Sequence, residues 1–411
     1  MTDALSQPLP LTATVTLPNR IGKGAMSENI ADESGAPSDL HTTLYRRWGE
    51  GGAGMLITGN VIVHAQGRTE PHNVLLEDDR HQPMLRRWAE AAQANGSKLF
   101  MQINHAGRQT MRAVTWEPVG PSAIPVQGRP GMFSVPRPLT DAEIESLVQR
   151  YAFVASQAHQ AGFAGAQIHG AHGYLVSQFL SPRTNQRTDR WGGSIDNRMR
   201  FLLEIAKAMR AATSPDFALS VKLNSADFQR GGFSAEDSVL VAQALEAEGI
   251  NLLEISGGSY EKPAMMGARA STRAREAYFL EYAETMRQTV KMPLMVTGGF
   301  RTRAGMLEAR ATGAVDVVGI ARPFAVDPDL ANKLLAGSDV PLDVGQPALG
   351  VRALDDLLQL FWYQAQMRRM AAGEAPHSKG GRVGALVRNI STMSKHIVAR
   401  RFRSEEHVIE G

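Results

Sequence analysis

Three side chains that can bind or move protons follow one another closely in the stretch AGAQIHGAHGY. His169, His172 and Tyr174 come directly after an apolar, glycine-flanked run over 164–168. Such a run predicts a short buried strand, so these side chains are expected at its tip. Two imidazole groups can converge on one oxygen atom, and tyrosine, with a reference pKa of about 10, can act as an acid at neutral pH. The pattern therefore predicts a site that holds an oxygen atom of a ligand next to a proton donor.

The spacing of His169 and His172 would also suit a pair of metal ligands. No nearby carboxylate or third histidine completes such a site, so we expect no metal there. A histidine is often only a satisfied structural residue, but the strand-end position and the nearby Tyr174 favour a functional interpretation.

Two other predicted strand ends carry groups suited to a phosphate. Gly298 and Gly299 allow backbone amides to approach an anion, and Arg322, after Ala321, supplies a fork of donors. Each feature alone is equally typical of an ordinary turn or a surface arginine. Together, at the end of the predicted seventh and eighth strands, they indicate a phosphorylated ligand.

Polar side chains also interrupt two apolar strands. Gln102 and Lys222 alternate with apolar neighbours, which predicts that they face the inside or the top of the fold. A buried lysine requires an anion, which is either a ligand or a carboxylate in a structural ion pair.

A regular alternation of strands and helices positions these residues. Eight short apolar runs predict strands over 21–26, 54–61, 98–104, 165–168, 218–224, 251–255, 293–297 and 316–320. Amphipathic stretches predict helices over 40–48, 82–94, 141–161, 197–212, 235–248, 275–289 and 303–312, with a last one beginning near 327–328, and Ser194 is expected to cap the fourth. Eight such units predict an α/β protein with a (β/α)8 TIM barrel, whose active site lies at the carboxyl ends of the strands.

Three segments do not belong to this repeat. Alternating residues over 11–17 predict a short hairpin, and the long segment 107–139, rich in proline and glycine, is expected to cap the barrel mouth and shape the substrate pocket. We expect residues 1–340 to form the barrel and residues 341–411 to form a basic, mostly helical extension. Its residues Trp362, Arg368 or Arg369 are expected to roof the active site or to contact another subunit.

Composition excludes several classes of protein. The 411 residues are 43% hydrophobic, enough for a sizeable core, and the formal charge of +3 is too small for a dedicated nucleic-acid binder. The absence of cysteine excludes disulfides, iron–sulfur clusters and a cysteine nucleophile, so any redox chemistry needs another cofactor. Without a signal sequence or an apolar run of about 20 residues, a soluble, cytoplasmic protein without membrane contact is expected.

The stretch from HGAHGY to GGSIDNR, over 169–198, resembles the signature of the Old Yellow Enzyme family of flavin-dependent ene-reductases. The resemblance covers about 10–335 and implies bound FMN, with NADH or NADPH as reductant. It implies that His169 and His172 hold the carbonyl oxygen of an activated alkene and that Tyr174 protonates its alpha carbon. It also implies a flavin site formed by Ala25, Met26, Ser27, Gly59, Gln102, Lys222, Gly298, Gly299, Ala321 and Arg322.

The same resemblance also indicates residues with a structural and not a catalytic role. Polar residues of the loop after the fourth strand correspond to a structural scaffold: Asn185, Arg187, Asp189, Asn197 and Arg198. The segment over 24–29 departs from the family pattern, because Gly24-Ala25 replaces a serine-proline pair and Glu28-Asn29 replaces apolar residues.

The activity that the resemblance implies is transfer of hydride from NAD(P)H through flavin N5 to the beta carbon of an α,β-unsaturated carbonyl compound. One alternative is an FMN barrel that reduces a dienoyl thioester, a nitro compound or a nitrate ester. Another is a non-catalytic ligand-binding or scaffold protein with a basic tail. A homo-oligomer is possible in each case.

Overall fold

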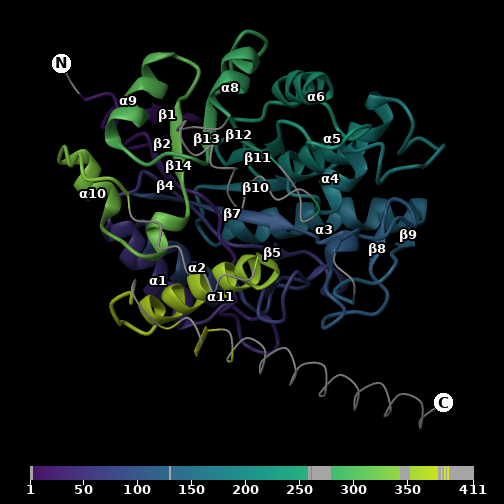
Figure 1. The fold of residues 1–411 in the computed structure, drawn as a ribbon, viewed down its shortest axis with the longest axis horizontal. Helices are drawn as coiled ribbons and strands as arrows, with labels where there is room; N and C mark the ends of the chain where they lie inside the picture. Colours follow the sequence, from purple (N-terminus) through teal and green to yellow (C-terminus); the bar gives the residue numbers. More distant parts are fainter. Residues whose placement is uncertain are drawn as a thin grey trace.

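Eight parallel strands form a closed barrel in the computed structural model, which describes residues 3–128, 131–257, 261, 279–342, 352–377, 381, 384–385 and 387 (Figure 1). The last strand pairs with the first, through Ile320 and Lys23, and so closes the ring. The predicted TIM barrel is confirmed. In order around the ring, the strands are β3 (Ile21–Lys23), β4 (Met55–Ile57), β7 (Lys98–Asn104), β10 (Gly165–Gly170), β11 (Ala218–Asn224), β12 (Leu252–Ser256), β13 (Leu294–Thr297) and β14 (Val317–Ile320).

Helices connect successive barrel strands and surround them in Figure 1. Ser194 accepts a hydrogen bond from the backbone N–H of Asn197, which confirms the predicted cap and starts that helix two residues earlier than expected. The predicted helix over 275–289 is described only from 279, because 275–278 lie outside the described residues. The helices around the barrel are α1 (Asp39–Glu50), α2 (Gln82–Gln93), α3 (Asp141–Gln160), α4 (Leu175–Leu180), α5 (Ile195–Ala211), α6 (Ala235–Ala247), α8 (Leu280–Arg287), α9 (Arg303–Ala311) and α10 (Leu330–Leu335).

Two predicted strands are shorter in the structure. The strand predicted over 21–26 ends at Lys23, and the one predicted over 54–61 divides into β4 and a separate strand β5 (Val61–Ile62), which pairs with β7 and β6 (Val74–Leu75). Between β4 and β5, the N–H of Gly59 donates to the carboxylate of Glu28 instead of continuing the ladder. A side-chain acceptor from another segment therefore ends the barrel pairing at this point.

The predicted hairpin is confirmed as strands β1 (Leu9–Pro10) and β2 (Thr16–Leu17), which pair antiparallel. Leu9, Val15 and Leu17 pack in one apolar cluster with side chains from the lower part of the barrel interior, among them Phe100 and Met295. This cluster fills the amino-terminal end of the barrel, so the other end remains for ligands.

The segment after β7 and the end of the chain both add structure to the barrel. Residues 107–139 contain the short strands β8 (Val119–Gly120) and β9 (Arg137–Pro138), which pair with each other. Helix α11 (Arg352–Ala371) packs against α1 and the short helix η4 (Arg322–Ala325), which confirms a helical extension (Figure 1). The division at residue 340 stays a prediction, and 343–351 and most of 378–411 lie outside the described residues. None of the described helices is long and apolar enough to cross a membrane.

Candidate active site

The inside of the barrel changes from apolar to polar toward the carboxyl ends of its strands. Above the apolar cluster that contains the hairpin, the amide of Gln102 donates to Gln167 at 2.8 Å. Gln167 in turn donates to Glu254 at 2.9 Å, so side chains join β7 to its neighbour β10, and β10 to β12, the next strand but one. Because every one of these groups is buried, the chain of hydrogen bonds fixes their orientation.

Lys222 and Glu254 lie opposite each other in the register of β11 and β12. The lysine Nζ is 2.8 Å from the carboxylate Oε1, with side-chain exposures of 4% and 0%. Lys222 therefore has the structural ion pair that the sequence left open, and it also lines the cavity described next. The other carboxylate oxygen of Glu254 accepts a hydrogen bond from Gln167. This bond and the ion pair together offset the cost of burying the negative charge.

A cavity of about 230 Å³ opens over this polar layer. Its walls come from the ends of strands β3, β10, β11, β12, β13 and β14, from η4 and from α11. Nine of the predicted site residues line it: Ala25, Met26, Ser27, His172, Lys222, Gly298, Gly299, Ala321 and Arg322.

His169, His172 and Tyr174 form one cluster at the tip of β10. The rings of His169 and His172 are 5.1 Å apart and nearly perpendicular, and the ring of Tyr174 is 4.8 Å from that of His169. Of the three, His172 lines the cavity, whereas His169 and Tyr174 are 3% and 7% exposed and lie directly behind it. The structure therefore brings the three predicted residues together beside the cavity.

His172 is held in an unusual backbone conformation from several sides. Its φ of 61° is in the left-handed region, which is rare for a residue with a side chain. The backbone N–H donates to Asn224 at 3.1 Å, the carbonyl accepts from Gln109 at 2.9 Å, and Nε2 is 2.8 Å from the hydroxyl of Ser256. Contacts from three separate elements therefore set the direction of this imidazole.

Both imidazoles are neutral at physiological pH. Burial lowers the pKa of His169 well below its ordinary value, and His172 and Lys222 lower it further. Burial, followed by the charge of Lys222, does the same to the pKa of His172. The N–H of Ala171 donates to Nδ1 of His169 at 3.3 Å, which leaves the single proton of the neutral ring on Nε2. His169 can therefore donate a hydrogen bond from Nε2 without carrying a charge.

The far end of the cavity has features that suit an anion. Gly298 and Gly299 follow β13 with φ of 124° and 93°, conformations that side chains would strain. The hydroxyl of Thr297 is buried there without a hydrogen-bond partner among the described residues. Arg322 lines the same end from η4. Backbone amides, a hydroxyl and a guanidinium at one cavity are together a donor set for a phosphate group.

The segment from Ala25 to Glu28 is fixed from behind by buried carboxylates that the sequence did not indicate. Glu28 accepts hydrogen bonds from the hydroxyl of Tyr45 and, at 2.9 Å, from the N–H of Gly59. A Cβ at position 59 would lie 1.9 Å from Glu28 and 2.4 Å from the carbonyl of Met26, so only glycine fits. Gly59 thus supports the cavity wall from behind.

Ser27 donates its hydroxyl hydrogen to a second buried carboxylate, that of Glu70. Burial raises the pKa of Glu70, and the hydrogen bonds from Ser27 and Gln364 oppose that rise. Because a serine hydroxyl has one hydrogen, Ser27 presents an acceptor to the cavity while Glu70 is ionised.

Several residues at the site were not among the predicted set. Gln167 and Glu254 alternate with apolar residues in their strands, the same signal that indicated Gln102 and Lys222. Glu28, Glu70 and the α11 side chains carry no such local signal. Helix α11 forms part of the roof through Gln359, Leu360, Tyr363 and Met367, whereas Trp362 is buried in the core, Arg368 donates to Asn29 and Arg369 pairs with Glu374.

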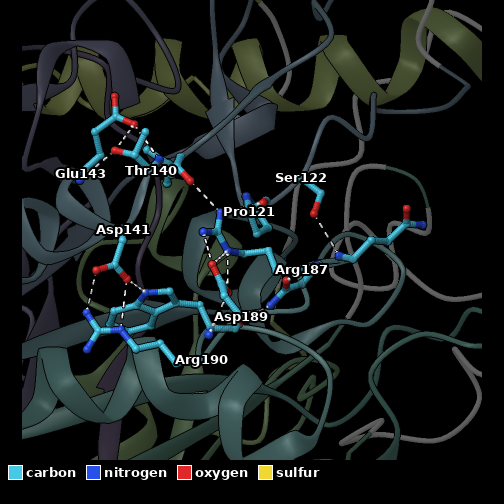
Figure 2. A network of polar contacts seen from close by, with 12 residues as sticks. Pro121, Ser122, Thr140, Asp141, Glu143, Arg187, Asp189 and Arg190 are labelled. Carbon is cyan, nitrogen blue, oxygen red and sulfur yellow. Dashed lines mark hydrogen bonds and ion pairs between the residues drawn. The ribbon is translucent and has the colours of Figure 1, made fainter.

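A network of polar contacts holds the capping segment against the loop after β10. In Figure 2, Arg187 donates to the carbonyl of Pro121 at 3.2 Å and pairs with Asp189, while Arg190 pairs with Asp141 at 2.9 Å. Arg187 also donates to the carbonyl of Leu139 at 2.6 Å, so one guanidinium joins both ends of the segment 121–139. These contacts lie away from the cavity and position the cap.

Comparison with known proteins finds relatives that match most of this chain. A family model described as the NADH:flavin oxidoreductase / NADH oxidase family matches residues 4–339. An NADH-dependent flavin oxidoreductase of Aspergillus parasiticus is 37% identical over 352 residues, which cover 81% of this chain and 79% of that protein. The structure of a 2-naphthoyl-CoA reductase in complex with 2-naphthoyl-CoA superposes with a TM-score of 0.79 and 29% identity, covering 84% of this chain and 55% of the other. The fold is shared with an Old Yellow Enzyme homologue from Zymomonas mobilis, with a TM-score of 0.70 and 24% identity, over 83% of this chain and 95% of that one.

Proposed function

This chain belongs to the NADH:flavin oxidoreductase / NADH oxidase family, as its resemblance to Old Yellow Enzyme predicts, and from that premise we propose that it is an FMN-dependent ene-reductase. Family membership makes it an FMN-dependent NAD(P)H oxidoreductase. The finer proposal is that it reduces the carbon–carbon double bond of an α,β-unsaturated carbonyl compound. The cluster of His169, His172 and Tyr174 beside the cavity is the observation that carries it.

The cavity residues fit FMN in chemical type. The glycine pair with positive φ, Arg322 and the hydroxyl of Thr297, which no described residue hydrogen-bonds, suit the phosphate. Ala25 and Met26 offer an apolar surface to the ring system, and Lys222 offers a positive charge to its pyrimidine edge. We propose that these residues, with Gln102 beneath them, hold the cofactor. When bound, FMN supplies a centre that accepts hydride from NAD(P)H and delivers hydride to the beta carbon of the alkene.

The protein side chains would polarise and protonate the substrate. Nε2–H of His169 and the imidazole of His172 would donate hydrogen bonds to the carbonyl oxygen and stabilise the negative charge that develops there. Neutral imidazoles suit this task, since their pKa values are lowered and they can donate without transferring a proton. Tyr174 would give its phenolic proton to the alpha carbon, which completes the reduction. Such hydrogen bonds typically lower the barrier by about 2.7–4 kcal/mol for each donor.

An absorbance experiment tests the proposal. The purified protein should show a flavin band near roughly 450 nm that bleaches with NADH or NADPH under anaerobic conditions and returns when cyclohexenone is added. Bleaching without recovery by the enone would retain the oxidoreductase and exclude the proposed substrate class. Comparing the two reductants in the same experiment identifies the preferred nicotinamide.

A second candidate is reduction of an unsaturated or aromatic acyl thioester. The likeness to the 2-naphthoyl-CoA reductase structure favours it, because that protein carries such a thioester by its description. Recovery of the flavin band with an enoyl-CoA but not with cyclohexenone would select this candidate.

A further inference from the structure

Helix α11 contributes four side chains to the wall of the cavity. They are Gln359, Leu360, Tyr363 and Met367. This helix lies beyond residue 339, where the match to the family model ends. Part of the cavity wall therefore comes from a segment outside the part of the chain that the family model matches.

The α11 side chains at the cavity suit an aromatic ring rather than a charged group. Leu360 and Met367 are apolar, Tyr363 presents an aromatic ring, and Met26 lines the same cavity from the start of the chain. Thioether and aromatic side chains contact flat aromatic surfaces favourably. The charged groups of the cavity, Lys222, Arg301 and Arg322, come from the barrel strands or the segments that follow them instead.

A buried hydrogen bond fixes α11 to the opposite wall. The amide of Gln364 donates to Glu70 at 2.6 Å, and the other oxygen of that carboxylate accepts from Ser27, which lines the cavity. Glu70 and Gln364 are only 5% and 2% exposed. The backbone N–H of Glu70 donates to the side chain of Asn73 at 2.8 Å, so the backbone that carries this carboxylate is itself held in place. We call the Glu70–Gln364 hydrogen bond the helix anchor.

A second contact one turn further on holds the same helix. The guanidinium of Arg368 donates to the carbonyl of Asn29 at 2.8 Å, at a turn where Asn29 has a φ of 53°. Trp362 and Met370 are buried in the main core, so the side of α11 away from the cavity is packed as well. Helix α11 is therefore a fixed part of the cavity wall.

We propose that α11 is part of the FMN site, that it closes the cavity over the apolar part of the isoalloxazine, and that the helix anchor sets how firmly the cofactor is retained. The proposal rests on FMN occupying this cavity, as in the proposed function. It does not depend on which compound reoxidises the flavin.

Two glutamines of α11 allow a matched test. Gln364 and Gln366 are both buried, at 2% and 1% exposure, but Gln366 accepts from the backbone N–H of His377 at 2.6 Å and does not contact Glu70. FMN release from the holoenzyme is followed by flavin fluorescence after dilution. Gln364→Ala should release FMN about tenfold faster than the wild type, and Gln366→Ala within about twofold of it. Equal release rates for the two variants would overturn the role of the anchor.

A substitution of Leu360 tests whether the α11 wall of the cavity contacts FMN. Leu360→Ala should weaken FMN binding about tenfold, whereas a raised KM for the enone with unchanged FMN release would assign the wall to the substrate and overturn the proposal.

Hydrogen exchange tests the same wall in the wild-type protein, so it does not depend on the folding of a variant. Amides over 358–371 should exchange more slowly with FMN bound than after its removal, and equal exchange would also overturn the proposal. A protein that binds FMN but does not reduce enones would contradict only the proposed substrate class. The proposal about α11 would still be testable, because FMN release and hydrogen exchange do not require turnover.

Discussion

The ammonium group of Lys222 and the carboxylate of Glu254 pair at 2.8 Å across neighbouring barrel strands, with the lysine at the cavity and the glutamate beneath it. A single buried pair thus joins the barrel interior to the ligand site. Gln167 also donates a hydrogen bond to Glu254, so the carboxylate keeps this partner even when Lys222 does not pair with it. The lysine charge can therefore face the cavity without being the only hydrogen-bond donor to this buried acid.

This pair makes a prediction about stability. Lys222→Met leaves Glu254 charged and buried without its paired cation, which should cost about 3–5 kcal/mol. In Lys222→Met/Glu254→Leu both charges are gone, so most of that loss should be recovered. Thermal unfolding of FMN-free protein measures both, without any contribution from the cofactor. A double variant that is no more stable than the single one would show that the pair is not what stabilises this layer.

The histidine that lines the cavity makes a prediction about rate. His172→Ala should slow reoxidation of the reduced enzyme by an enone about 10²–10³-fold, since one donor to the carbonyl oxygen is lost. His172→Asn keeps an amide N–H donor and should retain much of the rate. Stopped-flow absorbance of the second half-reaction gives the rates, and the flavin content of each preparation is the control. Loss of FMN in parallel with loss of rate would contradict the assigned role.

The tyrosine next to the histidines predicts a separable effect. Tyr174→Phe removes the proton donor but keeps the ring that packs 4.8 Å from His169. Reoxidation by the enone should slow about 10²–10⁴-fold, whereas flavin reduction by NAD(P)H should change little, because that step needs no proton from the tyrosine. Equal slowing of the two half-reactions would argue against Tyr174 as the acid.

Much of the fold could be predicted because its signals are local. Apolar runs and helix caps such as Ser194 are read from neighbouring residues, and eight repeats of one pattern leave few folds open. Strand ends were less predictable. The strand that starts at Met55 stops near Gly59 because Glu28, from another segment, takes the N–H that the ladder would use.

The site was predictable where polar residues interrupt apolar strands or follow strand ends, and not where it depends on contacts between distant segments. Gln102 and Lys222 show this pattern, and Glu254 shows it equally. The same pattern therefore also indicates the partner of Lys222. The contact between Glu70 and Gln364 joins residues 294 positions apart. Neither residue has a pattern around it that indicates the other, so α11 enters the cavity wall only when the fold is known.

The guanidinium that joins both ends of the capping segment makes a prediction about local order. Arg187→Ala removes donors to the buried carbonyl of Leu139 and to that of Pro121, so stability should fall by about 1–3 kcal/mol and residues 121–139 should be cleaved faster by proteases (Figure 2). Arg80→Ala breaks an exposed ion pair with Asp78 and should change stability by less than about 1 kcal/mol. Mass spectrometry of limited digests locates the cleavage. Similar digests for both variants would show that Arg187 does not hold the cap.

Three buried histidines and the partly buried His172 predict that the fold loses stability in mild acid. Burial lowers the pKa of His41 and His105 to about 3 and those of His169 and His172 well below 6.5, whereas the unfolded chain binds these protons near pH 6.5. The unfolded state thus holds more protons below that pH. Stability is fully present above about pH 6.5 and falls as the pH decreases, by about 1.4 kcal/mol per pH unit for each histidine.

His41 allows this to be measured at one position. Its Nδ1 accepts from the backbone N–H of Ser38 in a capping box at the start of α1, a role that glutamine also performs. His41→Gln should therefore lose little stability at pH 8 and should become more stable relative to the wild type as the pH is lowered from 6 to 4. The difference between the two free energies of unfolding should change by about 1.4 kcal/mol per pH unit over that range, because only one proton site has been removed. Urea unfolding of both proteins at a series of pH values gives this difference. A difference that does not change with pH would mean that His41 takes up its proton in the folded protein as readily as in the unfolded chain.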